Sequence, residues 1–176
     1  MKKRGQVQLS FSVIFSVIII IATLAVAGYI IVQFINRTKD VECKLFYDDL
    51  QKKIDTAWQA DDSVSSIFTE SVAAKTEKVC FGNVSQNVQD EKDQAAYDAL
   101  KNFASTTDNL FFYPRTVCGG SKFRFNLKHA KTDTFFCVSV INKQASVKVA
   151  KGSFDSLVKL CTKDKPCPIS DVAPTS

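Results

Sequence analysis

The chain contains neither glycine nor proline between Gly28 and Gly82. These residues are the usual helix breakers, so nothing in this stretch forces a helix to end. Residues 11–35 also lack Asp, Glu, Lys and Arg. This uncharged apolar run exceeds the roughly 20 residues that cross about 30 Å of hydrocarbon. We therefore predict one transmembrane helix that continues outside the membrane, over residues 7–59.

The chain also has few of the groups that catalysis and metal binding need. Its only histidine is His129, which we predict to be a structural histidine at the rim of a strand. Asp61, Asp62 and Ser63 lack the oxygen spacing and central glycine of a calcium loop, and predict a solvated turn. Residues 118–122 lack the spacing of a phosphate loop and predict a disulfide-tethered turn. We predict no cofactor, metal site, catalytic residue or small-molecule substrate.

The cysteines all follow the apolar run. An even set in a small domain is typical of disulfides formed in an oxidising compartment. A zinc site is the alternative, but the sequence contains no Cys-x2-Cys pair, so disulfides are preferred. The short spacing across Pro166 predicts one pairing, Cys161 with Cys167, and leaves the other two open. The six candidates are Cys43, Cys80, Cys118, Cys137, Cys161 and Cys167.

The charges that flank the apolar run predict its orientation. A purely basic segment precedes the run, and a mixed segment follows it, which favours a cytoplasmic N-terminus and an extracellular domain. A cleavable secretory signal is the competing interpretation, but its apolar region is only about 7 to 15 residues long. The net charge of +5 is scattered, so we predict no nucleic-acid interface. The flanking charges are Lys2, Lys3 and Arg4 before the run, and Arg37, Lys39, Asp40 and Glu42 after it.

The remaining pattern predicts an α+β fold with an antiparallel sheet of four or five strands. Apolar residues recur every four positions at Phe46, Leu50, Ile54 and Trp58, which indicates one buried helix stripe. Further helices are predicted over residues 90–104 and 153–161, and residues 61–71 as a loop. Strands are predicted at 78–84, 109–113, 123–129, 135–141 and 146–150, the last three as a meander.

These patterns divide the chain into four segments. Residues 1–10 form a basic leader, residues 11–35 the transmembrane helix, residues 36–168 the extracellular domain, and residues 169–176 a flexible tail. Two glycosylation sequons occur. The one at Asn36 lies too close to the membrane, whereas Asn83 is a candidate glycan site.

The N-terminal segment resembles the class III signal peptide of archaeal type IV pilin-like proteins. The matching residues are Lys3, Arg4, Gly5 and Gln6, placed directly before the apolar helix. The resemblance covers about 35 residues and implies cleavage by a prepilin peptidase after Gly5, a pilin-like fold and assembly into a filament. Ser10 stands where that family usually has a glutamate that pairs with a neighbouring subunit. An ordinary basic flank before a membrane anchor is the alternative.

The domain, with its aromatic run at residues 110–114, looks similar to uncharacterised secreted domains on such anchors in archaea. We therefore expect a non-enzymatic surface protein in the cell membrane. Its expected partners are the lipid bilayer and, through self-association or contact, pilus or envelope proteins. The alternatives are an accessory subunit of a membrane complex and a membrane-tethered envelope enzyme.

Overall fold

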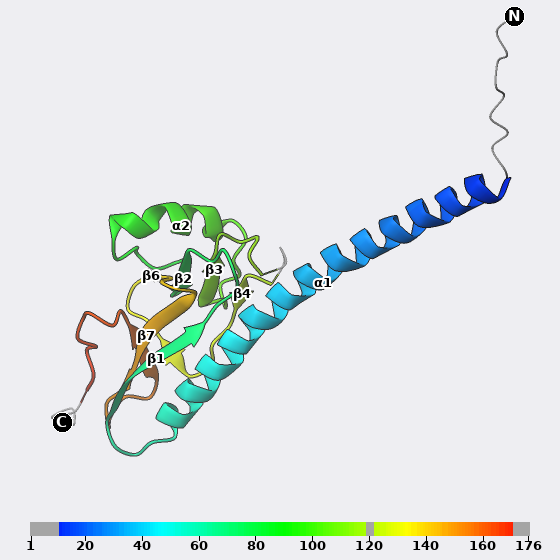
Figure 1. Ribbon diagram of the computed structural model, residues 1–176. Coiled ribbons are helices and arrows are strands. Elements are labelled where there is room, and N and C mark those ends of the chain that lie inside the picture. Colours follow the sequence, from blue (N-terminus) through cyan, green and yellow to red (C-terminus); the bar gives the residue numbers. More distant parts are fainter. Residues whose placement is uncertain (1–10, 119–121, 171–176) are drawn as a thin grey trace, which may run out of the picture. The chain divides into compact units, whose positions relative to one another are not determined.

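The computed structural model describes residues 11–118 and 122–170, without the side chains of residues 35–37. The chain separates into two compact units, Met1–Arg37 and Thr38–Ser176. Helix α1, Phe11–Trp58, contributes to both units (Figure 1). The leader residues Gly5 and Gln6 lie outside the described residues, as do residues 119–121 of the turn expected after Cys118.

The first unit presents apolar side chains on every side of α1. Residues 11–34 are all exposed, and α1 is the one helix among the described residues that is long and apolar enough to span a membrane. Two of its hydroxyl groups bond to the helix backbone: Ser16 Oγ donates to Ser12 O at 2.8 Å, and Thr23 Oγ1 donates to Ile20 O at 2.9 Å. Such internal satisfaction is what a hydrocarbon environment requires of polar groups.

The part of α1 in the second unit, residues 38–58, is amphipathic. Phe46, Leu50 and Ile54 are 1% exposed or less, which confirms the predicted stripe. The Phe46 ring makes edge-to-face contacts with Phe68 and Phe112, at centroid distances of 5.4 and 5.6 Å. Trp58 departs from the stripe and is 39% exposed, because it lies on the last turn of the helix.

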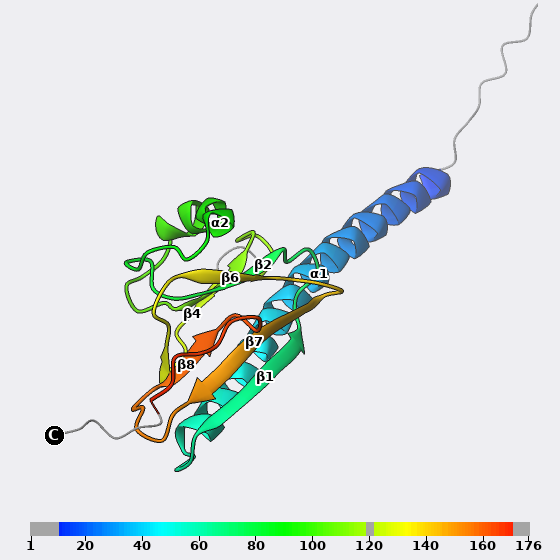
Figure 2. The same cartoon turned by 90° about the vertical axis from the view of Figure 1, so that its left-hand side faces the viewer.

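The α+β class is confirmed, but the single predicted sheet is wrong. Two four-stranded sheets form, with the orders β1-β7-β8-β5 and β4-β3-β2-β6, and one pair, β5 with β8, is parallel. We call these the first and the second sheet. Figure 2 shows β8, β7 and β1 of the first sheet side by side. The strands are β1 Val64–Ser71, β2 Lys78–Phe81, β3 Leu110–Tyr113, β4 Arg124–Phe125, β5 Ala130–Lys131, β6 Phe136–Ser139, β7 Gln144–Lys151 and β8 Val158–Cys161.

Three local predictions are wrong. Residues 61–71, predicted as a loop from their Ser, Asp and Thr content, contain the longest edge strand, β1. Residues 153–161, predicted as a helix, end in strand β8, whose Val158 and Leu160 are buried alternately. The predicted meander does not form, because β4 pairs with β3, β6 with β2, and β7 with β1 and β8. Non-local pairing outweighs local propensity in each case.

The second helix and the hairpin turn follow their sequence signals. Helix α2, Glu91–Lys101, begins at Asp90, whose side chain accepts a hydrogen bond from Lys92 N, close to the prediction of residues 90–104. Asn142 and Lys143 adopt positive φ angles of 52° and 61° in the two-residue turn between β6 and β7. Such a turn usually joins two paired strands. Here β6 and β7 belong to different sheets, and the single bridge between Ile141 and Gln144 connects them next to the turn.

Three disulfides crosslink the second unit. Cys161 with Cys167 confirms the predicted pairing. Cys43 with Cys118 connects α1 to the segment after β3, and Cys80 with Cys137 joins directly opposite residues of β2 and β6. No free cysteine remains among the described residues, so the zinc alternative is excluded for these six.

Candidate functional site

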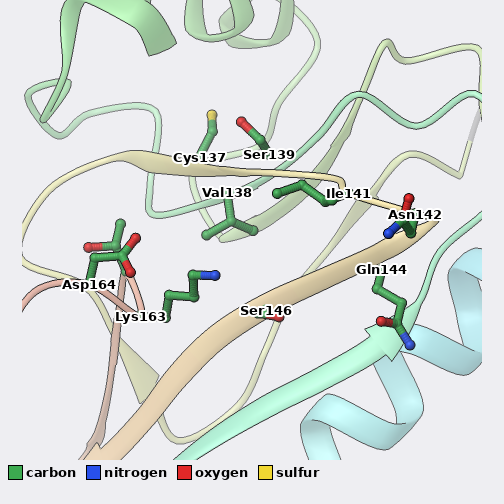
Figure 3. A pocket seen from close by; sticks show the side chains of 10 residues that line it. Cys137, Val138, Ser139, Ile141, Asn142, Gln144, Ser146, Lys163 and Asp164 are labelled. Carbon is green, nitrogen blue, oxygen red and sulfur yellow. The ribbon is translucent and has the colours of Figure 1, made fainter.

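A hollow in the described part of the second unit lies beside the β6–β7 turn. It has a volume of about 410 Å³ and opens between β6 of the second sheet, β7 of the first sheet, and the segment after β8 (Figure 3). We call it the turn cleft. Its lining residues are Cys137, Val138, Ser139, Ile141, Asn142, Gln144, Ser146, Thr162, Lys163 and Asp164.

The turn cleft carries hydrogen-bonding groups of several kinds. Hydroxyl and amide groups come from β6, β7 and the turn, and Lys163 and Asp164 add one charge of each sign. Thr162 Oγ1 is buried without a hydrogen-bond partner, whereas Ser146 Oγ is 2.9 Å from Thr69 Oγ1. Cys137 is held in a disulfide and is therefore no nucleophile. The groups present suit the binding of a polar ligand or peptide.

His129 lies at the end of α1 and not in the turn cleft. Its ring stacks on Trp58 with a centroid separation of 3.8 Å and an interplanar angle of 4°. Its Nδ1 is 3.2 Å from Asp55 Oδ1, which also accepts a hydrogen bond from Gln51 Nε2 at 2.8 Å. His129 has a φ of 58°, so β5 begins directly after a left-handed residue. The structural role predicted for His129 agrees with these contacts, but the strand predicted over residues 123–129 is wrong, because β4 ends at Phe125 and His129 lies in the turn before β5.

The two sequons differ in what the structure describes. The Asn36 side chain lies outside the described residues. Asn83 is half-buried, its Nδ2 donates to Thr106 O, and its Oδ1 accepts from Ser85 N at 2.8 Å. Asn83 thus links its segment to Thr106 and Ser85 in this conformation, and its glycosylation stays a prediction.

Residues beyond β8 are attached to the turn before it. The Asp155 carboxylate accepts hydrogen bonds from Gly152 N and Ser170 N, both at 3.0 Å, and lies 3.5 Å from Lys159 Nζ. Burial alone would raise the pKa of Asp155, but the two backbone donors, the Ser170 side chain and Lys159 together hold it below its ordinary value. Residues 171–176, most of the tail predicted to be flexible, lie outside the described residues.

A second, smaller hollow of about 210 Å³ lies where α1 faces the end of β1. Its walls combine three carboxylates with one ammonium group and an apolar floor, and we call it the acidic hollow. The sequence prediction missed it, because β1 was predicted as a loop. The lining residues are Glu42, Leu45, Phe46, Asp49, Glu70, Ser71, Val72 and Lys143.

The described residues contain no group of three His, Cys, Asp or Glu side chains that could hold a metal ion. No family model, no curated protein and no solved structure matches the chain. Function must therefore be argued from the features of the chain itself.

Proposed function

We propose that the chain is a membrane-anchored protein whose disulfide-bonded domain lies outside the cell and acts by contact with other molecules, without catalysis. One observation carries this proposal. An uncharged helical segment with every side chain exposed is followed by a domain whose six cysteines form three disulfides. Exposed apolar surface of this extent needs lipid to cover it, and disulfides persist outside the cytosol.

Within this proposal, the chain is a subunit of type IV pilin-like character. The support is the basic segment ending in Gly5 and Gln6, directly before the apolar helix. The filament form would bring the apolar segments of many subunits together, which also covers their exposed side chains. Ser10 supplies no carboxylate to pair with a neighbouring amino terminus, so the assembly would depend on apolar packing and on contacts of the domain.

The test uses the protein recovered from its native membrane. We expect an intact mass that fits a chain starting at Gln6 with six half-cystines, and Gln6 as the first residue in N-terminal sequencing. We also expect lysines of the domain to react with a membrane-impermeant amine reagent on whole cells. A chain that keeps Met1 would reduce the proposal to a plain anchor. Free thiols or unreactive domain lysines would contradict the extracellular placement.

An accessory subunit of a membrane complex is the second candidate. One face of the apolar segment is hollowed beside small side chains, at Ala22, Thr23 and Ala27 between Ile19 and Ile30. Small residues allow helices to approach closely in a bilayer. Extraction in a mild detergent distinguishes the candidates, because an accessory subunit would copurify with other membrane proteins in fixed stoichiometry and a filament subunit mainly with copies of itself.

A further inference from the structure

The two sheets have four edge strands, and three of them are short or covered. Strands β4 and β5 have only two residues each. Strand β6 is covered at its start, because Cys137 N donates to Asp93 Oδ2 of α2 at 2.8 Å. Strand β1 is different, since it has eight residues and pairs only with β7.

The outward-facing backbone groups of β1 follow from its register with β7. Val72 N donates to Lys143 O at 2.9 Å, so the backbone groups of Val72 point toward β7. In an antiparallel pair the direction alternates along the strand, so the N–H and C=O groups of residues 64, 66, 68 and 70 also point toward β7. The N–H and C=O groups of the alternate residues therefore face away from β7. Within residues 11–118 and 122–170, no hydrogen bond involves these outward backbone groups, which belong to Ser65, Ile67, Thr69 and Ser71.

Strand β1 also lacks the features that usually prevent an edge from pairing with another chain. Its sequence, VSSIFTES, contains no lysine, arginine, proline or glycine. Native edge strands are commonly protected by such residues, by bulges or by short length. Its solvent-facing side chains Ser65, Ile67, Thr69 and Ser71 are uncharged, so they would not repel an added strand of either charge.

The acidic hollow lies at the Ser71 end of this edge. Its carboxylates are Glu42 and Asp49 of α1 and Glu70 of β1, and Lys143 is its only cation. No salt bridge joins these side chains to one another in the part of the chain that the structure describes. A basic side chain from a partner would therefore meet unpaired negative charge there, next to the apolar groups of Leu45 and Phe46.

The inner face of β1 adds one more requirement. Ser66 Oγ is buried and has no hydrogen-bond partner, whereas Phe68, two residues along, is 8% exposed and packs against Phe46. Unpaired buried hydroxyls are costly, so a polar group from a neighbouring strand would be stabilised opposite Ser66. From the Ser71 end, the inner face thus presents a carboxylate, an aromatic ring and a hydroxyl at Glu70, Phe68 and Ser66.

We propose that β1 binds an extended segment of another protein as an additional antiparallel strand. The segment has a basic residue opposite Glu70, an apolar residue opposite Phe68 and a hydroxyl-bearing residue opposite Ser66. Because it runs antiparallel to β1, its sequence from N- to C-terminus is Lys-x-apolar-x-Ser. The outward groups of β1 supply the main-chain hydrogen bonds, and the alternate side chains supply selectivity. The inference names the contact surface of the proposed function, but binding by the purified chain does not depend on its membrane orientation.

The probe is the synthetic peptide Thr-Lys-Thr-Val-Thr-Ser-Thr, with blocked termini, added to the full-length chain in detergent micelles. We expect saturable binding and slower hydrogen exchange at the amides of Ser65, Ile67, Thr69 and Ser71. Methylating the peptide nitrogens at its third and fifth residues, which face these amides, should weaken binding by about tenfold or more. Replacing the peptide lysine by glutamate should weaken it by about tenfold.

A charge exchange tests the register. The Glu70→Lys variant should lose affinity for the lysine peptide and regain it for the glutamate peptide. The matched control, Glu91→Lys on helix α2, changes the net charge equally and should bind as the unmodified chain does. Absence of binding, or equal loss in both variants, would overturn the proposal. Protection of the β1 amides without peptide, together with dimerisation, would assign this edge to a second copy and overturn it as well.

Discussion

The two parts of helix α1 have the same helical backbone conformation, but the polarity and exposure of their side chains differ. In residues 11–34 every side chain is exposed and none is charged. In residues 38–58, Phe46, Leu50 and Ile54 are buried and the other faces carry charges. A helix that is apolar all round needs an apolar solvent, whereas a single stripe needs only a protein core. Because the helix is continuous, its secondary structure does not indicate where the apolar segment ends. The position of the first charged residues does indicate it.

The largest effect should come from releasing residues 38–58 from the domain. The double substitution Cys43→Ser with Cys118→Ser removes a disulfide that closes a sequence separation of 75 residues. Loop-closure entropy predicts a loss of about 4 kcal/mol in the free energy of unfolding. The measurement is urea unfolding in detergent, followed by fluorescence of Trp58, the only tryptophan.

The matched control is Cys161→Ser with Cys167→Ser, whose separation is 6 residues. The same reasoning predicts a loss of about 2 kcal/mol for this smaller loop. Equal losses for the two double variants would contradict the view that the longer crosslink holds the outer part of α1 on the domain.

Shortening a buried side chain of the stripe should have the next largest effect. Leu50 is fully buried, so Leu50→Ala should lower the free energy of unfolding by about 3 kcal/mol through lost burial and a residual cavity. Leu45 on the same helix is 55% exposed, and Leu45→Ala should change the free energy of unfolding by less than about 0.5 kcal/mol. Similar losses at both positions would mean that another molecule covers Leu45.

A charge in the other part of the helix should affect membrane insertion and leave the folding of the domain unchanged. Leu24→Asp places a carboxylate in the uncharged segment, where Leu24 is 68% exposed, and should cost about 3 kcal/mol of insertion free energy. The fraction of protein that resists carbonate extraction measures this cost. Leu45→Asp is the control and should leave that fraction unchanged; an equal decrease would place Leu45 within the membrane.

The sequence predicted the features that depend on local pattern. These features are the long helix α1, the stripe at Phe46, Leu50 and Ile54, helix α2 near residues 90–104, and the Cys161–Cys167 pair, and they follow from periodicity or short spacing. Each of these involves residues close together in the chain, so propensity and tertiary structure agree.

The failures concern contacts between distant segments. Strand β1 has a polar composition because one face is solvated, and its identity as a strand depends on β7, which lies about 80 residues later. The acidic hollow depends on the same pairing, since Glu70 and Lys143 come from these two strands. Neither Cys43–Cys118 nor Cys80–Cys137 could be assigned without knowing which elements are neighbours.

The smallest expected effect comes from removing the charge of Asp155. The domain stabilises this carboxylate, whereas nothing in the uncharged segment would stabilise the carboxylate of the Leu24→Asp variant. The pKa of Asp155 is lowered because Ser170 N, Gly152 N, the Ser170 side chain and Lys159 together outweigh the effect of its burial. A lowered folded-state pKa means that the ionised carboxylate stabilises the fold above the unfolded value of about 3.9. This stabilisation is lost as the pH falls through the folded value. Asp155→Asn should therefore lower the free energy of unfolding by about 1 kcal/mol at pH 7.

The pH dependence separates charge from shape at this position. Unfolding of the unmodified chain and of Asp155→Asn should differ at pH 7 and converge as the pH falls through the folded-state pKa of Asp155, which lies below its unfolded value of about 3.9, because both chains then carry a neutral group. A difference that stays constant with pH would mean that the hydrogen-bond geometry at Gly152 and Ser170 matters and the charge does not. Convergence would show that this domain stabilises a partly buried carboxylate with its own donors, which the uncharged segment of α1 cannot do for an aspartate at position 24.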